Sequence, residues 1–231
     1  MSNPPETTSP LAFAADALAP LADQDRFDAL TDALAENGWW VDPQGLDAEL
    51  LQALQQELDE LLAAEQLQRA GVGRELEFHL DSDIRRDRIV WLNRQRPVQA
   101  RFLDLMEQLR LSLNRRLFLG LFEFEAHFAH YPRGGFYKRH YDSFRGAANR
   151  LVSVVAYLNQ NWQPGDGGEL VIHPEQETEP KVVVPPRGGT LVVFLSEETP
   201  HEVLQTAKPR NSIAGWFRLN GSVGNQIDPP R

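Results

Sequence analysis

The sequence predicts an α+β, mainly β domain in which two antiparallel sheets carry helices on one face. Apolar residues recur at helical spacing in the first half of the chain, up to about residue 117. After Gly120 the pattern changes to short stretches rich in Val and Phe, which turn-forming sequences separate. Helices followed by many short strands are typical of this arrangement.

Three helices are expected in the N-terminal half. The first covers about 27–37 and ends at Gly38, because glycine readily takes the left-handed conformation that ends a helix. The second extends from about Asp47 to Gln68 with a stripe of leucines, which we expect to pack on the core of the same domain. Pro97 opens the third helix, since proline suits the first helical position.

The strands are expected to be short and to form a double-stranded β-helix, that is, a cupin-like jelly roll. Between the second and third helices, the polar, glycine-containing segment 71–88 is expected to be a mobile lid loop. The expected strands are 89–92, 122–128, 151–158, 169–172, 181–184, 190–195 and 212–219.

Length and composition indicate one globular domain. The 231 residues, 42% hydrophobic and 24% charged, can bury one sizeable core. We expect a loose arm at 1–24, a single domain at 25–220 and a tail at 221–231. Within the domain, 25–117 would give helical support and 118–220 the jelly-roll core.

The charge balance and the lack of cysteine limit the possible partners. A net charge of −10 argues against a general nucleic-acid surface or an anionic membrane, although five arginines cluster between residues 85 and 96. The chain has no cysteine, no leader-like N-terminus and no apolar run long enough to span a bilayer. These features predict a cytoplasmic protein, which we expect to be a monomer.

Two histidines and one aspartate are the strongest chemical signal. His140 and Asp142 are two residues apart, a spacing that places both on one side of a strand, and His201 follows far along the chain. Two imidazoles and one carboxylate hold non-haem Fe(II) on one face and leave the opposite face open. A His-x-Asp pair alone is a weak signal, so the prediction depends on the third ligand and on its strand context.

Arg210 follows His201 near the start of the last strand. A buried guanidinium is costly unless it is paired, and its fork geometry suits a carboxylate, so a carboxylate co-substrate is expected. Tyr157 offers a hydroxyl to the same carboxylate, or is an ordinary buried residue. The histidines without a motif are expected to be structural or exposed; they are His79, His127, His130 and His173.

Several segments between about residues 71 and 219 together resemble the Fe(II)/2-oxoglutarate dioxygenases and, within them, the hypoxia-sensing prolyl hydroxylases. The resemblance is carried by Asp83-Ile84-Arg85-Arg86-Asp87 with Ile89 and Trp91, Tyr131-Pro132, Tyr137 to Asp142, Arg150, Tyr157-Leu158-Asn159, Trp162, Gly167 to Leu170, Pro200 to Val203, and Arg210 through Trp216.

This resemblance implies a role for each matching residue. His140, Asp142 and His201 would bind iron, while Arg210, Tyr157 and Tyr131 would hold 2-oxoglutarate. The substrate would meet Arg150, Arg85, Asp87 and Trp216, with Asp87 pairing with Arg150 when the lid closes. The alternative for Trp216 is an ordinary core position. An Asp87–Arg150 pair that is exposed would contribute little to stability. Ala214 replaces a threonine of the eukaryotic relatives, which puts co-substrate affinity in question.

The implied reaction is hydroxylation of a prolyl residue with O₂ and 2-oxoglutarate, giving succinate and CO₂, with ascorbate as a supporting reductant. A protein with an exposed proline loop is the expected partner, with elongation factor Tu as a candidate because bacterial relatives are associated with it. Two alternatives remain at this stage. One is a 2-oxoglutarate oxygenase that acts on a small molecule or free amino acid, and the other is a non-catalytic cupin-like binding protein.

Overall fold

The structure is a computed structural model that describes residues 23–70, 84–143, 150–174 and 179–219. Its helices are α1 (Asp23–Asn37), α2 (Ala48–Ala63) and α3 (Pro97–Leu117). Its strands are β1 (Trp39–Asp42), β2 (Gln68–Arg69), β3 (Arg88–Trp91), β4 (Leu121–Tyr131), β5 (Tyr137–His140), β6 (Arg150–Tyr157), β7 (Leu170–Ile172), β8 (Val182–Val184), β9 (Leu191–Leu195), β10 (His201–Val203) and β11 (Arg210–Leu219).

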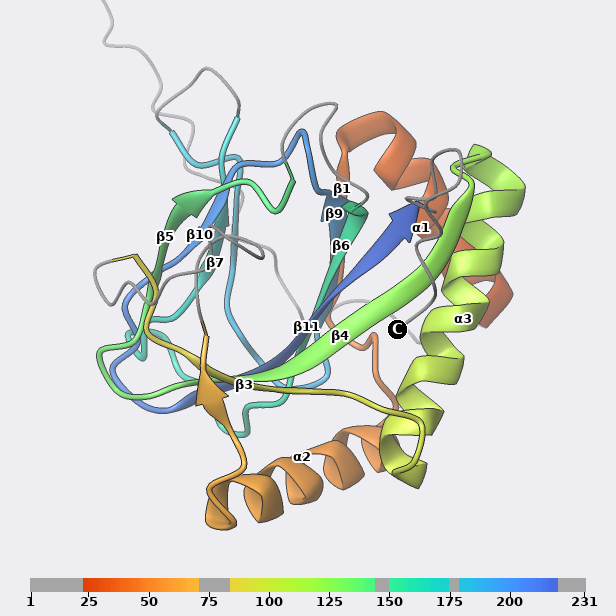
Figure 1. Ribbon diagram of the computed structural model, residues 1–231. Coiled ribbons are helices and arrows are strands. Elements are labelled where there is room, and N and C mark those ends of the chain that lie inside the picture. The colour runs from red at the N-terminus through yellow and green to blue at the C-terminus, as the bar shows by residue number, and fades with distance from the viewer. Residues whose placement is uncertain (1–22, 71–83, 144–149, 175–178, 220–231) are drawn as a thin grey trace, which may run out of the picture.

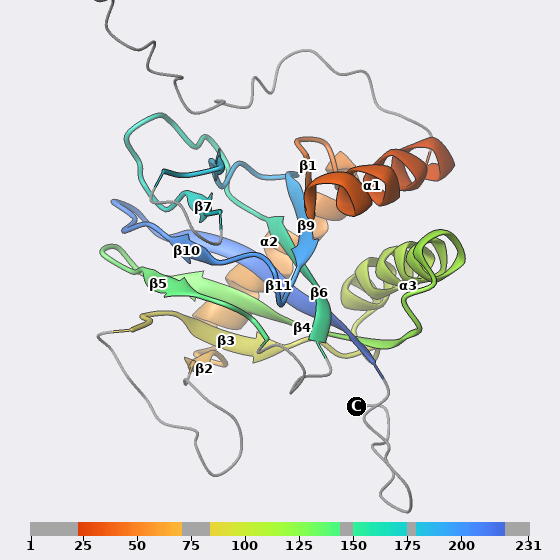
Figure 2. The ribbon, with the colours of Figure 1, turned by 90° about the horizontal axis from the view of Figure 1, so that it is seen from above.

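The strands form two antiparallel sheets, which confirms the predicted fold class. The large sheet has the order β1-β9-β6-β11-β4-β3-β2, and the small sheet has the order β5-β10-β7-β8. The small sheet lies on one side of the large sheet and helices α1 and α3 lie on the other (Figure 1). The view from above shows the same order of layers (Figure 2). The helices thus cover one face of the large sheet and leave the other face to the small sheet.

Alternation along the strands separates two cores. On β6, Val152, Val154 and Ala156 belong to the core shared with the helices, whereas Tyr157 belongs to the core between the sheets. Strand β4 follows the same rule, since Ala126 and Phe128, two residues apart, pack in the core on the helix side. Side chains of the opposite parity therefore face the space between the two sheets, where a site can form.

The helix boundaries show which local signals the chain uses. Gly38 takes a φ of +80° and its N–H donates to the Leu34 carbonyl at 3.0 Å, so α1 ends where the sequence predicted. Helix α2 ends at Ala63, earlier than the expected Gln68, because Glu65 takes the left-handed conformation at a φ of +53°. A glutamate at such a position gives no recognisable sequence signal.

Two strands lie inside the segment expected to be helical support and were not predicted. Strand β1 depends on its pairing with β9, and β2 has only two residues and pairs with β3. The expected arm and tail lie outside the described residues, apart from residues 23 and 24, which begin α1. Most of the expected lid, residues 71–83, also lies outside them. No helix in the described ranges is long and apolar enough to cross a membrane.

Candidate active site

His140, Asp142 and His201 converge at the end of the small sheet. The register of β5 and β10 places His140 directly opposite His201, and their ring centroids are 4.3 Å apart. Nε2 of His140 lies 3.6 Å from one carboxylate oxygen of Asp142, and Nε2 of His201 lies 3.7 Å from the other. One potential ligand atom from each residue lies within 4.8 Å of the other two. This spacing can accommodate one metal ion.

Backbone carbonyls fix both imidazole rings. Nδ1 of His140 lies 2.7 Å from the Lys138 carbonyl, and Nδ1 of His201 lies 3.0 Å from the Thr199 carbonyl. A carbonyl oxygen only accepts hydrogen bonds, so each Nδ1 carries the proton and each neutral ring keeps its lone pair on Nε2. Burial and the neighbouring His140 lower the pKa of His201 to about 4, which keeps this ring neutral at pH 7. Both rings therefore present the tautomer that binds a metal through Nε2.

Asp142 lies beyond the end of β5, not on the strand as its spacing from His140 predicted. Burial alone would raise its pKa, but the two imidazoles and the Ser153 hydroxyl outweigh burial and lower it. Ser153 Oγ donates to Asp142 at 2.7 Å and contacts Ser196 Oγ at 2.8 Å. This serine pair was not predicted, because a serine within a Val-rich strand gives no motif.

Arg210 begins β11 and is only 2% exposed. Nε donates to the Gly168 carbonyl at 2.8 Å, and Nη1 donates to Ser212 Oγ at 3.3 Å. Within the described ranges no carboxylate pairs with this guanidinium. Since an unpaired buried charge is costly, the environment of Arg210 favours an anionic ligand.

Two tyrosines flank this guanidinium. The ring centroids of Tyr131 and Tyr157 each lie 5.0 Å from Cζ of Arg210. Burial raises the pKa of both phenols, so both remain hydroxyl donors. Among the described residues, the buried Tyr157 hydroxyl has no hydrogen-bond partner. A ligand carboxylate beside Arg210 would supply an acceptor for it.

Arg150 and Trp216 form a second cluster near the three ligand candidates. Cζ of Arg150 lies 3.6 Å from the Trp216 ring centroid, and Trp216 is opposite Ser153 in the sheet register. Glu125 accepts from Arg150 Nε at 2.8 Å and from Nη2 at 2.6 Å. The expected partner Asp87 does not bind Arg150 in this structure. Glu125 takes that place, since it pairs with Trp216 across β4 and β11.

Asp87 instead binds Arg85 on the same segment. The two side chains form a bidentate pair with distances of 2.7 and 2.6 Å, and Asp87 is buried. Burial opposes charge on Arg85, but the bond and charge of Asp87 outweigh this and raise the pKa of Arg85. Cζ of Arg85 lies 4.5 Å from the Tyr137 ring centroid, and Tyr137 stacks on His140 at 3.6 Å. Arg85 is thus linked to the predicted metal site through one aromatic ring.

His127 was expected to be structural or exposed, and in the structure it is a buried residue beside Trp216. Its ring centroid lies 5.4 Å from that of Trp216 and 5.1 Å from that of Trp91, which is 48% exposed. Burial lowers the pKa of His127 to about 3, so the ring is neutral. Trp91 is exposed, and its strand β3 is next to the edge strand of the sheet.

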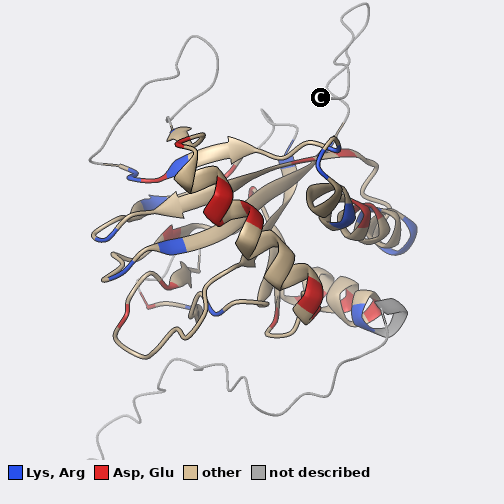
Figure 3. Cartoon of the chain, turned by 90° about the horizontal axis from the view of Figure 1, so that it is seen from below, with Lys and Arg blue, Asp and Glu red and all other residues tan. Residues whose placement is uncertain are grey.

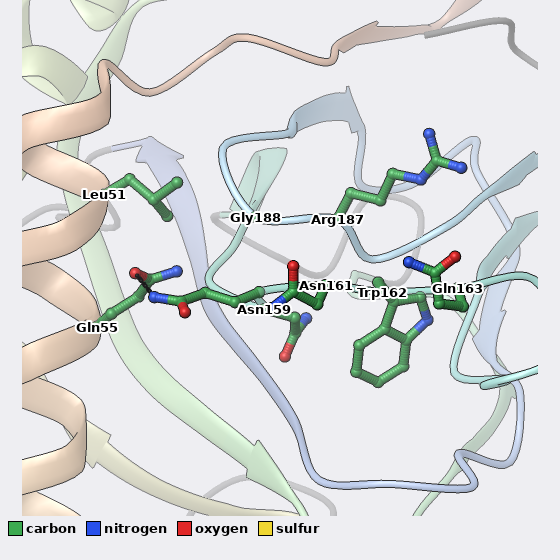
Figure 4. Close-up of a pocket in the computed structure, with 9 residues that line it drawn as sticks. Leu51, Gln55, Asn159, Asn161, Trp162, Gln163, Arg187 and Gly188 are labelled. Carbon is green, nitrogen blue, oxygen red and sulfur yellow. Dashed lines mark hydrogen bonds between the residues drawn. The ribbon is translucent and has the colours of Figure 1, made fainter.

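An open depression of about 630 Å³ lies apart from these residues (Figure 4). It lies between α2, the turn after β6 and the turn before β9. None of the predicted site residues lines it. Its lining residues are Leu51, Gln55, Asn159, Gln160, Asn161, Trp162, Gln163, Arg187 and Gly188.

The double-sheet fold, the His-Asp-His cluster and the unpaired buried arginine define a non-haem iron oxygenase of the jelly-roll class. Comparison with known proteins agrees with this class. Residues 126–218 match the family model of the 2OG-Fe(II) oxygenase superfamily. The crystal structure of a Pseudomonas putida prolyl-4-hydroxylase is 43% identical, with a TM-score of 0.76, and the match covers 84% of this chain and 98% of that one.

The chain therefore belongs to the prolyl hydroxylase family of Fe(II)/2-oxoglutarate-dependent dioxygenases. A Trichoplax adhaerens prolyl hydroxylase in complex with a hypoxia-inducible-factor peptide has the same fold. Its sequence identity is 24% and its TM-score 0.76, over 85% of this chain and 90% of that one. A viral collagen prolyl hydroxylase from Paramecium bursaria Chlorella virus-1, bound to 2-oxoglutarate, is 16% identical with a TM-score of 0.57. That match covers 80% of this chain and 98% of the viral one.

The residues present fit the iron and the co-substrate that this family uses. The two imidazoles present Nε2 toward one carboxylate, as a facial three-ligand site requires. The partner-free Tyr157 hydroxyl and the buried Arg210 suit the distal carboxylate of 2-oxoglutarate. Fe(II) is thus the metal of this enzyme, and 2-oxoglutarate and O₂ are its co-substrates.

Proposed function

We propose that this enzyme hydroxylates a prolyl residue within a protein, with His140, Asp142 and His201 as the iron ligands. The main support is the identity of 43% to the P. putida prolyl-4-hydroxylase across 98% of that protein. The reaction converts 2-oxoglutarate and O₂ into succinate and CO₂ and transfers one oxygen atom to a prolyl C–H bond. The protein's own residues bind, orient and enclose the reactants.

Arg210 and Tyr157 anchor the distal carboxylate of 2-oxoglutarate in this proposal. A guanidinium that is 2% exposed and lacks a carboxylate partner in the described ranges needs an anion, and this is the observation on which the co-substrate site depends. Tyr131, whose ring lies beside the same guanidinium, narrows the pocket around the bound co-substrate. Ala214 has no hydroxyl to offer, so the affinity depends on Arg210 and Tyr157.

The substrate polypeptide lies, in this proposal, across the surface formed by Arg150, Trp216, Arg85 and Asp87. Glu125 holds Arg150 over the Trp216 ring, so that Arg150 can donate to a backbone carbonyl without further ordering. Arg85 reaches the site through its contact with Tyr137. The T. adhaerens relative is in complex with a peptide fragment of hypoxia-inducible factor, so a protein with this fold binds a peptide.

A translation elongation factor with an exposed proline loop is the candidate target. The rival function is oxidation of a small molecule or free amino acid, because enzymes of nogalamycin biosynthesis share the fold with TM-scores of 0.60 and 0.64. Their identities of 18% and 14% are far below that of the P. putida prolyl-4-hydroxylase, so we favour the protein substrate.

The experiment that tests this proposal is mass spectrometry of cellular proteins with and without the gene. We expect at least one proline to carry an added oxygen atom in wild-type cells and to lose it after deletion. Complementation with the wild-type gene should restore the modification, whereas the matched Asp142→Ala gene should not. Unchanged prolyl modification in the deletion strain, together with turnover of free proline by the purified enzyme, would favour the small-molecule function.

A further inference from the structure

Two segments beside the metal site carry a strong excess of positive charge. Residues 84–88 and 131–140 contain six cationic side chains and one carboxylate, Asp87, in a chain whose net charge is −10. The cationic residues are Arg85, Arg86, Arg88, Arg133, Lys138 and Arg139. Arg85 and Asp87 form an ion pair with each other, so their charges cancel.

The fold brings the two segments together. The Arg86 amide donates to the Phe136 carbonyl at 3.1 Å, and the Lys138 amide donates to the Ile84 carbonyl at 3.0 Å. Arg88 begins β3, where it is opposite His130 of β4, and Arg133 lies in the turn between β4 and β5. Lys and Arg positions lie at this end of the molecule and also on α3, whereas Asp and Glu positions mark α2 (Figure 3). We call Arg88, Arg133, Lys138 and Arg139 the basic rim.

The basic rim is exposed and lacks internal neutralisation. All four side chains are exposed, and none has a carboxylate partner among the residues that the structure describes. Arg139 instead donates to the Pro174 carbonyl at 2.9 Å. By contrast, the other two members of the arginine cluster noted in the sequence are paired, Arg94 with Asp104 and Arg96 with Glu57.

Two of the four rim residues adjoin the metal site. Lys138 and Arg139 directly precede His140 on β5, and Arg85 contacts Tyr137, which stacks on His140. A polypeptide whose reacting residue lies at His140, Asp142 and His201 would therefore have this rim beside it. Positive charge beside the site attracts carboxylates of such a polypeptide and repels cationic sequences.

We propose that the basic rim selects acidic polypeptides, by binding Asp and Glu residues that flank the target residue of the substrate. This inference rests on the proposed function, since it assumes that a polypeptide enters the site. An overall charge of −10 would otherwise repel acidic proteins, so a local cationic surface next to the metal removes that barrier at the point of contact. A phosphate polymer or a second copy of this acidic chain are the other occupants that the experiment distinguishes.

The test compares two fluorescent peptides that share a central proline and differ only in flanking Glu or flanking Lys residues. Binding is measured by anisotropy at low and high salt for the wild type and for Arg88→Glu/Arg133→Glu. The matched control, Arg115→Glu/Arg187→Glu, makes the same change in net charge at exposed positions outside the rim. At low salt we expect the wild type to prefer the Glu peptide about tenfold, which corresponds to about 1.4 kcal/mol.

We expect the preference in the wild type and in the control, its loss in the rim variant, and its weakening at high salt. Equal affinity for the two peptides, no measurable binding, or a preference that survives in the rim variant would overturn the proposal. Two further results would overturn it, both with equal binding of the two peptides. In the first, the rim residues are needed for binding a single-stranded oligonucleotide. In the second, they are needed for a dimer seen by sedimentation. Oxygen addition to the Glu peptide is read separately by mass spectrometry, so a failure of hydroxylation is distinguishable from a failure of charge selection.

Discussion

The chemistry of the site depends on single atoms that the backbone holds in place. The Lys138 and Thr199 carbonyls set the tautomers of the two histidines, and the Ser153 hydroxyl orients Asp142. Such hydrogen bonds commonly change metal affinity by about 10- to 100-fold when they are removed. The ligand types were predictable from the sequence because iron chemistry restricts them to a few residue types. Ser153 was not, because only its place in the sheet makes it a partner of Asp142.

Tyr157 gives a prediction at this scale. Tyr157→Phe removes a hydroxyl that has no partner within the described structure, so the free energy of unfolding without co-substrate should stay the same or rise slightly. The KM for 2-oxoglutarate should rise by about tenfold to 100-fold, since a hydrogen bond to a charged group contributes about 1.5–3 kcal/mol. Initial-rate kinetics and denaturant titration of the same samples check both parts.

Arg210→Lys is the companion variant, because it keeps the charge and loses the fork. It should raise the same KM while iron remains bound. A Tyr157→Phe enzyme that is less stable than the wild type, with an unchanged KM, would mean that the hydroxyl serves the fold and does not bind the co-substrate.

At the scale of elements, the parity of the strands separates packing from chemistry. On β6 the even-numbered residues from Val152 to Ala156 pack against the helices, while the odd-numbered Ser153 and Tyr157 face the site. The main strands and the starts of α2 and α3 were predictable because alternation, capping residues and turn residues are local signals, whereas α1 begins earlier than expected, at Asp23. Strand β1 was not, since it exists through pairing with β9, and the position of Asp142 beyond β5 depends on the local course of the chain.

Glu125 gives the prediction for the β4–β11–β6 pairing. Glu125→Gln removes the charge that holds Arg150 on Trp216, so the KM for peptide substrates should rise several-fold. Decarboxylation of 2-oxoglutarate without peptide should keep its rate, because it does not need Arg150. Steady-state assays with and without peptide separate the two effects.

Glu123→Gln is the matched control on the same strand. Glu123 pairs with Arg218, which Glu125 also approaches at 3.6 Å, so the control removes one carboxylate beside Arg218 and keeps the Glu125 carboxylate that binds Arg150. Equal loss of both activities in Glu125→Gln would show that Glu125 supports the fold and not substrate binding. An effect of the same size in the control would lead to the same conclusion.

At the scale of the whole molecule, stability should depend on pH through a buried neutral histidine. The pKa of His127 is lowered to about 3 in the folded state, against an ordinary value near 6.5 in the unfolded chain. As the pH falls below 6.5, the unfolded state binds a proton that the folded state does not, so stability decreases until the pH reaches the folded pKa. For this group the loss between pH 7 and pH 5 is about 2 kcal/mol.

Denaturant titration of the wild type and of His127→Gln at the two pH values checks this prediction. The variant should lose about 2 kcal/mol less than the wild type over this interval, because glutamine does not titrate. His130→Gln is the control, since His130 is only partly buried and its Nδ1 already bonds Asn211. Identical pH dependence in the wild type and His127→Gln would mean that this ring is not held neutral by the fold.

The most direct test of the central claim is equilibrium dialysis of Fe(II) under anaerobic conditions, with 2-oxoglutarate present. We predict one bound iron per chain in the wild type, because His140, Asp142 and His201 form a single three-ligand site. Asp142→Ala should lose this iron while it retains the folded circular-dichroism spectrum, and the matched Asp166→Ala protein should still bind one iron. One tightly bound iron in Asp142→Ala, or none in the folded wild type, would contradict the account.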